Sequence, residues 1–214
     1  MDDLTPVHLR DGTEAVVVPL LSANREALEQ EYEHLSPKTR FGRFLAVVPE
    51  LSDKMLDHLV DEVDGIDHVA LVLLILTEDG TELPLGLARI IRYPNDPTAA
   101  DVAVTVVDDW QGRGVATALL EVLMRQRPKG VERIVTVINA DNAASLAMLR
   151  RLGDVQVSQP EAGTEDVVVE LPGAADSRRL GRPRWHAPGS AGHRVPCCRQ
   201  GRPMSDHERS GWPE

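Results

Sequence analysis

The chain has 214 residues, of which 42% are hydrophobic and 27% charged, and its formal net charge is −11 at pH 7. This length and composition predict a soluble protein with one main domain. The longest apolar run, Val69 to Leu76, is far shorter than the roughly 20 residues that a membrane helix needs, and the acidic start argues against a signal peptide. We therefore expect a cytoplasmic protein with no membrane contact.

Charge divides the sequence into two parts. Residues 173–214 hold eight arginines and four acidic residues and are rich in glycine, proline and serine, which leaves 15 basic and 30 acidic residues in the body. This pattern predicts a folded domain over 1–172 and a disordered tail over 173–214. The acidic body argues against nucleic-acid binding and suits either cationic partners, such as amines, or solubility alone. The cysteines, Cys197 and Cys198, are adjacent and lack the spacing of a zinc site, so we expect no metal.

Strand and helix signals alternate from the start of the body. A run rich in valine, Ala15–Leu20, predicts the first strand. Two amphipathic segments follow, 23–35 and 51–63, and they predict helices with Ser22 and Ser52 as their N-caps. The first half therefore reads as one strand followed by two helices.

The second half predicts a mixed sheet. Two apolar runs between His68 and Tyr93 are joined through Asp79-Gly80, a dipeptide favoured in tight turns, so they form a hairpin. Because crossovers between parallel strands are right-handed, the later strands at 102–107 and 134–138 should be parallel neighbours. The remaining elements are a helix opening at Gln111, a helix from Asn142 to about Arg151, and a last strand over 166–171. The order predicts an α+β fold with an antiparallel front half.

The segment Asp108 to Leu120 places two glycines around an arginine just before an apolar helix. A helix N-terminus offers unpaired N–H groups, and Gly112 and Gly114 would let an anion approach the backbone. Arg113 can add a charge-assisted hydrogen bond to the same anion. The turn therefore predicts a phosphate-binding site, although a turn that only packs the helix tightly on the sheet would show the same glycines.

Two common phosphate-binding motifs do not fit this turn. A dinucleotide fingerprint needs Gly or Ala where this chain has Thr117, and a P-loop needs Gly-Lys-Ser/Thr, which is absent. The stretch VTVVDDWQGRGVATALL instead resembles the acyl-CoA signature of the GCN5-related N-acetyltransferases (GNAT): a strand, then Q/R-x-x-G-x-G/A, here Gln111, Gly114 and Ala116, then an amphipathic helix. The stretch NADNAASLAMLRRLG is similar to the second motif of the family. The resemblance covers about residues 6–171.

A closer resemblance is to the bacterial protein lysine acetyltransferases of the Pat type. It is carried by LSPKTRFGRF, VDGIDHVALV, GLARIIRYPNDPTAADVAV and DNAASLAMLRRLG. It implies the GNAT fold, in which a mixed central sheet has antiparallel N-terminal strands, a splayed parallel strand pair and flanking helices. It also implies acetyl-CoA as cosubstrate and a protein acceptor with a target lysine, such as an acyl-CoA synthetase.

The resemblance further implies which residues hold acetyl-CoA. The pantetheine arm would pair with the edge of the strand at Val104, Thr105 and Val106, where the N–H of Val106 would polarise the thioester carbonyl. Asn142 would hydrogen-bond the CoA arm, but capping its helix is also a sufficient role. The pyrophosphate would lie on the backbone of Gln111, Gly112, Arg113, Gly114, Val115 and Ala116.

The attacking amine needs a base, because a lysine amine with a pKa near 10.4 is neutral in only about one molecule in 2,500 at pH 7. In the Pat group a Glu in an A-E-V-A context serves, and the matching residue is Asp101, one methylene shorter. Asp101 could also be a plain solvated carboxylate. Many family members place a Tyr seven residues after the helix-opening Asn, to protonate the thiolate, and this chain has Leu149 there.

The sequence therefore predicts an N-acetyltransferase that modifies protein lysine by direct attack in a ternary complex, with Asp101 as general base. Two alternatives stay open: acetylation of a small amine such as a polyamine or an aminoglycoside, and a degenerate acyl-CoA sensor without transfer. The sequence leaves open whether the protein is a monomer or a dimer. Arg40 and Arg43 either line the acceptor side or anchor their helical turn, and His68 is expected to be structural.

Overall fold

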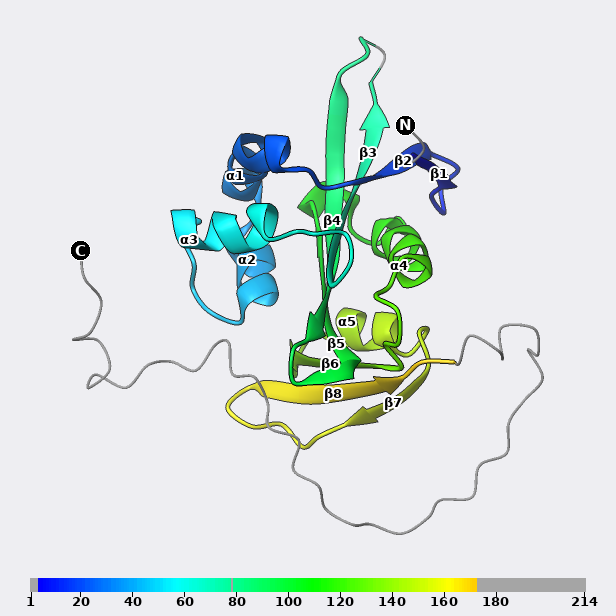
Figure 1. The fold of residues 1–214 in the computed structure, drawn as a ribbon. Helices are drawn as coiled ribbons and strands as arrows, with labels where there is room; N and C mark the ends of the chain where they lie inside the picture. Colours follow the sequence, from blue (N-terminus) through cyan, green and yellow to red (C-terminus); the bar gives the residue numbers. More distant parts are fainter. Residues whose placement is uncertain (1–3, 78, 173–214) are drawn as a thin grey trace.

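The computed structural model describes residues 4–77 and 79–172. One eight-stranded sheet runs through them in the order β1-β2-β3-β4-β5-β6-β8-β7 (Figure 1). The strands are Thr5–His8 (β1), Glu14–Pro19 (β2), His68–Leu76 (β3), Glu82–Tyr93 (β4), Asp96–Val106 (β5), Arg133–Asn139 (β6), Asp154–Val157 (β7) and Thr164–Glu170 (β8). The helices are Arg25–His34 (α1), Pro37–Phe44 (α2), Asp53–Leu56 (α3), Val115–Arg125 (α4) and Ala143–Leu149 (α5), with short helical turns at Ser22–Asn24, Asp57–Asp61 and Asp108–Trp110.

The sheet changes direction once, between β5 and β6. Strands β1 to β5 pair antiparallel in chain order, and so do β6 with β8 and β8 with β7. The β5–β6 pair is parallel, and its register holds only Ala99 opposite Arg133 and Ala100 opposite Ile134. Beyond Ala100 the two strands separate. This confirms the expected α+β fold, with its mixed sheet and splayed parallel pair.

Helices cover both faces of the sheet. Figure 1 shows α1, α2 and α3 on one side of β3 to β5 and α4 on the other. The larger apolar core lies under α4, whose buried face includes Val115, Leu119 and Leu123, and a smaller one lies under α1 to α3 around Tyr32 and Leu59. Alternate side chains of β5 therefore point toward the core under α4 or toward the core under α1 to α3.

Several local expectations need correction. Ser22 does not cap α1: it begins a 3₁₀ turn, and the side chain of Asn24 accepts a hydrogen bond from the N–H of Leu21 instead. The helix expected to open at Gln111 begins at Val115, because the preceding glycine backbone has positive φ. Ser52 caps α3 as expected, by accepting from the N–H of Met55. Strands β1 and β7 and helix α2 were not expected from the sequence.

The tail expected over 173–214 lies outside the described residues, and so do both cysteines. No helix within the described residues is long and apolar enough to cross a membrane.

Candidate active site

The turn between β5 and α4 exposes a row of backbone N–H groups. Gly112 has φ +75° and Gly114 has φ +100°, a region that side-chain-bearing residues rarely adopt. A Cβ on Gly114 would also come within 3.0 Å of Cγ of Arg10. Among the described residues, the N–H groups from Gly112 to Ala116 have no acceptor. The turn therefore presents unpaired donors at the N-terminus of an eleven-residue helix, which fits an anionic group such as a pyrophosphate.

Arg113 does not point freely into this turn. Its Nε donates to Oδ2 of Asp11 at 2.7 Å, and its guanidinium lies 3.8 Å from the ring centroid of Trp110. The hydrogen bonds of Thr13 and then that of Arg113 lower the pKa of Asp11 to about 2. Arg113 thus braces the turn against the β1–β2 loop. Its proposed contact with an anion stays a prediction that would require sharing this guanidinium with Asp11.

A polar network that no motif in the sequence predicts joins the turn to helix α2. Asp108 accepts hydrogen bonds from the N–H and hydroxyl of Ser36, at 2.9 and 2.7 Å, and from the hydroxyl of Thr39 at 2.7 Å. Gln111 donates through Nε2 to Thr39 Oγ1 at 3.1 Å and to the carbonyl of Val106 at 3.2 Å. The partners lie some 70 residues apart, so no local pattern could reveal them. Gln111 therefore links the turn both to α2 and to the end of β5.

The edge of β5 is open at Val104 to Val106, where the resemblance implies that the pantetheine arm binds. Val107 donates its N–H to the carbonyl of Leu85 on β4. Because backbone groups alternate sides along a strand, the N–H and carbonyl groups of Val104 and Val106 point toward the separated β6. Two hydrogen bonds support this orientation of the backbone: Thr136 donates to the carbonyl of Val102 at 3.3 Å, and Gln111 donates to the carbonyl of Val106. The Val106 N–H is therefore available to a ligand in the opening.

Asp101 is a half-buried carboxylate rather than a solvated one. It lies opposite Ile91 in the register of β4 and β5, next to the point where β5 and β6 separate. Burial raises its pKa above the usual value, and this outweighs the hydrogen bond of Thr136 and the charges of Arg43 and Arg89, which lower it. A carboxylate with a raised pKa is a stronger proton acceptor than a solvated one.

A cavity of about 240 Å³ lies between the sheet and helices α1 and α2. Its wall is mostly apolar, and it includes Arg43 from α2 and Thr105 from β5, with Glu31 and Glu82 as its acidic members. Arg40, by contrast, donates to three backbone carbonyls, those of Glu33, Leu35 and Pro49. Arg40 thus anchors its helical turn, while Arg43 lines a cavity on the face of β5 that carries Asp101 and Thr105.

Asn142 occupies the N-cap of α5, where its Oδ1 accepts from the N–H of Ser145 at 3.1 Å. The capping role is therefore confirmed. Its amide nitrogen has no hydrogen-bond partner among the described residues, so it stays free to donate to a ligand. Leu149, at the position of the family tyrosine, is fully buried in the core under α4 and α5. No proton donor stands there.

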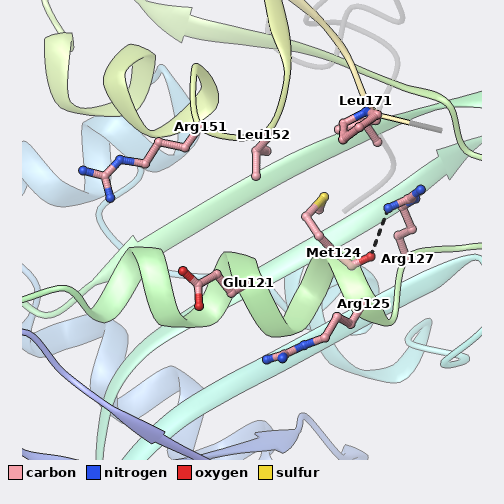
Figure 2. A pocket seen from close by; sticks show the side chains of 8 residues that line it. Glu121, Met124, Arg125, Arg127, Arg151, Leu152 and Leu171 are labelled. Carbon is pink, nitrogen blue, oxygen red and sulfur yellow. Dashed lines mark hydrogen bonds between the residues drawn. The ribbon is translucent and has the colours of Figure 1, made fainter. Parts of the chain in front are cut away.

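A second hollow, of about 340 Å³, lies away from this turn between the C-terminal half of α4 and the end of β8. Figure 2 shows the side chains of Glu121, Arg125, Arg127 and Arg151 around it, with Arg127 bound to the carbonyl of Met124. It shares no lining residue with the cavity between the sheet and helices α1 and α2. In the described part of the chain, no cluster of three or more His, Cys, Asp or Glu side chains could hold a metal ion.

Comparisons with known proteins agree with this geometry. The sequence matches the Acetyltransferase (GNAT) family over residues 28–154. It is similar to Acetyltransferase PA5475 of Pseudomonas aeruginosa, at 33% identity over 158 residues, which are 73% of this chain and 83% of that protein. It is 32% identical to Acetyltransferase Pat of Mycolicibacterium smegmatis over 168 residues, 78% of this chain but only 49% of that protein. The crystal structure of the GNAT domain of S. lividans PAT matches with a TM-score of 0.66 at 29% identity, over 78% of this chain and 97% of that one.

Proposed function

The chain belongs to the GNAT family of acetyltransferases and uses acetyl-CoA as its cosubstrate, and from this premise we propose that it acetylates the side-chain amine of a protein lysine. The observation that carries the proposal is Asp101, a half-buried carboxylate beside the opening of β5 and β6. A carboxylate in this place can take the proton of an amine that enters over the same face. The acyl donor would lie along the adjacent edge of β5.

The chain's own groups divide the binding of acetyl-CoA between them. The N–H groups from Gly112 to Ala116 would receive the pyrophosphate, and the backbone of Val104 and Val106 would pair with the pantetheine arm. The amide nitrogen of Asn142 would donate to the same arm. The N–H of Val106 would then hold the negative charge that develops on the thioester oxygen.

The transfer balances without a metal or a second cofactor. Asp101 takes one proton from the acceptor ammonium, and the neutral nitrogen attacks the thioester carbon. The bound nitrogen then gives up a second proton to solvent, and the carbon–sulfur bond breaks to release the amide and CoA as thiolate. Direct attack requires both substrates together, hence a ternary complex. With Leu149 in the place of an acid, the thiolate leaves without protonation by that residue, which a thiol pKa near 8.5 permits.

Two features favour a protein lysine over a small amine. The motifs quoted above resemble the Pat-type lysine acetyltransferases. The apolar wall of the cavity that Thr105 lines suits the four methylene groups of a lysine stem. An acyl-CoA synthetase is the partner class that the resemblance suggests. The acetylation of this protein would then take place in the cytoplasm.

The test compares wild type with Asp101→Asn, which keeps the shape and loses the base. Each is given acetyl-CoA and a purified acyl-CoA synthetase, CoA release is followed, and mass spectrometry locates acetyl-lysine. We expect site-specific acetylation that falls about 10²- to 10⁴-fold in Asp101→Asn while acetyl-CoA affinity holds. Asp154→Asn, an exposed carboxylate on β7, serves as control and should keep full activity.

Other outcomes would point elsewhere. Rapid acetylation of spermidine or an aminoglycoside, with none on the protein, would replace the lysine proposal with a small-amine enzyme. Saturable acetyl-CoA binding without transfer to any amine would favour the sensor reading, which Leu149 and the short side chain of Asp101 support. Full activity in Asp101→Asn would remove the assigned base.

A further inference from the structure

We propose that Arg89 and Arg43 are positioning residues for Asp101: their charges keep this carboxylate ionised in its half-buried place and disfavour the ammonium form of the amine beside it. The inference rests on the proposed role of Asp101, and it gives Arg89 and Arg43 an electrostatic role that neither the resemblance nor the comparisons assign.

The register of the sheet places Arg89 and Asp101 on one face. Arg89 lies opposite Ala103, and Asp101 is two residues from Ala103 on the same strand. Alternate residues of a strand share a face, and diagonal neighbours of this kind have Cα atoms about 7–8 Å apart. Arg43 reaches this face from α2, which packs on β5, and it lines the cavity there. Two guanidinium groups thus approach one carboxylate from different elements.

Arg89 is the more unusual of the two. It is only 2% exposed, and its Nη2 donates to the carbonyl of Leu59 at 2.7 Å, while Nε and Nη1 have no hydrogen-bond partner. Among the described residues, no carboxylate lies within ion-pair distance of Arg89 or Arg43. A buried charge with unpaired donors destabilises the fold relative to an apolar side chain of similar size. The single hydrogen bond from Arg89 to the backbone of Leu59 does not offset the burial of its charge.

An electrostatic effect of Arg89 on Asp101 accounts better for a buried arginine at this position. The groups that face Asp101 are Arg43 from α2, Arg89 from β4 and the hydroxyl of Thr136 from β6. His68 and His58 lie close together, with ring centroids 5.6 Å apart, and burial followed by the charge of Arg89 lowers the pKa of His68. Burial lowers the pKa of Arg89 to about 9, with Arg43 adding to this effect and Asp101 opposing it. Arg89 therefore remains cationic at neutral pH.

The two positive charges act on both partners of the proton transfer. Burial favours the protonated form of Asp101 by raising its pKa, and a protonated carboxyl cannot receive another proton from the amine. The guanidinium groups oppose that protonation. They also repel an ammonium, so a lysine amine held there gives up its proton more readily, as lysines beside a second cation do. The neutral amine then attacks the thioester carbon while the proton stays on Asp101.

The test is the pH dependence of kcat/KM for the acceptor at saturating acetyl-CoA. We expect Arg89→Met to move the acidic limb upward by about one pH unit, the size of a charge effect at this separation in a partly buried site. Arg89→Lys, which restores the charge, should return the limb toward wild type. Arg43→Gln should shift it in the same direction, and Arg125→Gln, in the distant hollow of Figure 2, should leave it in place.

The outcomes separate this inference from the proposed function. Activity that survives Asp101→Asn would refute the base itself. Activity that needs Asp101 but keeps the same acidic limb in both arginine variants would refute only the electrostatic role. If Arg89→Met does not fold, Arg43→Gln decides alone, because Arg43 is half-buried on the surface helix α2.

Discussion

His68 should make the stability of the domain depend on pH between its ordinary pKa of 6.5 and its lowered pKa of about 4. It begins β3, is 5% exposed, and its Nε2 has no hydrogen-bond partner. Burial, followed by the charges of Arg89 and His58, lowers its pKa from 6.5 to about 4. The unfolded chain therefore binds a proton at His68 between these values, and the folded chain does not. Stability from this group is present above about pH 6.5 and is lost as the pH falls toward 4.

The magnitude follows from the two pKa values. Each pKa unit corresponds to about 1.4 kcal/mol, so a shift of this size amounts to roughly 3 kcal/mol in full and to about 2 kcal/mol between pH 7 and pH 5. We expect the free energy of unfolding of the wild type to fall by about 2 kcal/mol more over this range than that of His68→Gln, which cannot gain a proton.

Urea unfolding followed by circular dichroism at both pH values measures this difference. His34→Gln, which replaces an exposed histidine at the end of α1, serves as control and should behave as wild type. Equal losses in the wild type and in His68→Gln would show that His68 is protonated in the folded protein. The reasoning about its burial and its cationic neighbours would then be wrong.

Two further predictions concern the glycine turn and the hydrogen bonds that join Asp108 to helix α2. Gly114→Ala should lower both thermal stability and acetyl-CoA affinity, because it adds backbone strain of about 1–2 kcal/mol and a close contact with Arg10. Gly112→Ala has open space for its Cβ and should add the strain alone. Equal effects of the two substitutions on stability would contradict this prediction. Asp108→Asn should cost about 1–2 kcal/mol in urea unfolding at pH 7, because Ser36 and Thr39 lose a charged acceptor. Burial would raise the pKa of Asp108, but these hydrogen bonds outweigh it and lower the pKa below 3.8, so the difference should shrink as the pH falls below about 4.

The parts of the fold that the sequence predicts are those with a strong local pattern. The hairpin of β3 and β4 follows from two apolar runs around Asp79-Gly80, and the apolar face of α4 follows from its helical spacing. Strands β1 and β7 are four residues each and partly exposed, so they carry no clear alternation. Helix α2 has a proline at its first turn and a glycine inside, and its N-cap at Ser36 became visible only in the structure.

The site divides in the same way. Gly112 and Gly114 were predicted as an anion-binding turn because glycines between a strand and a helix are a local signal, whereas the open edge of β5 was expected only from the resemblance to the GNAT family. The approach of Arg89 and Arg43 to Asp101 depends on the register between β4 and β5 and on the packing of α2, which the sequence alone does not fix. The unpaired donors of Arg89 mark it only once burial is known.

The separation of β5 from β6 explains why both halves of the proposed chemistry meet at one strand. A strand paired on both sides has no free N–H groups, but β5 loses its parallel partner after Ala100 and so offers those of Val104 and Val106 to a ligand. The side chains of Asp101 and Thr105 share the face of β5 on which α2 packs, and Thr105 lines the cavity there. A donor bound along the edge and an acceptor entering over the face would thus meet at β5. The hydrogen bonds from Ser36 and Thr39 to Asp108 hold the helix that carries Arg43 to the turn proposed to bind the pyrophosphate. Asp108→Asn weakens these hydrogen bonds and should therefore lower kcat/KM for both substrates, although Asp108 is assigned no contact with either.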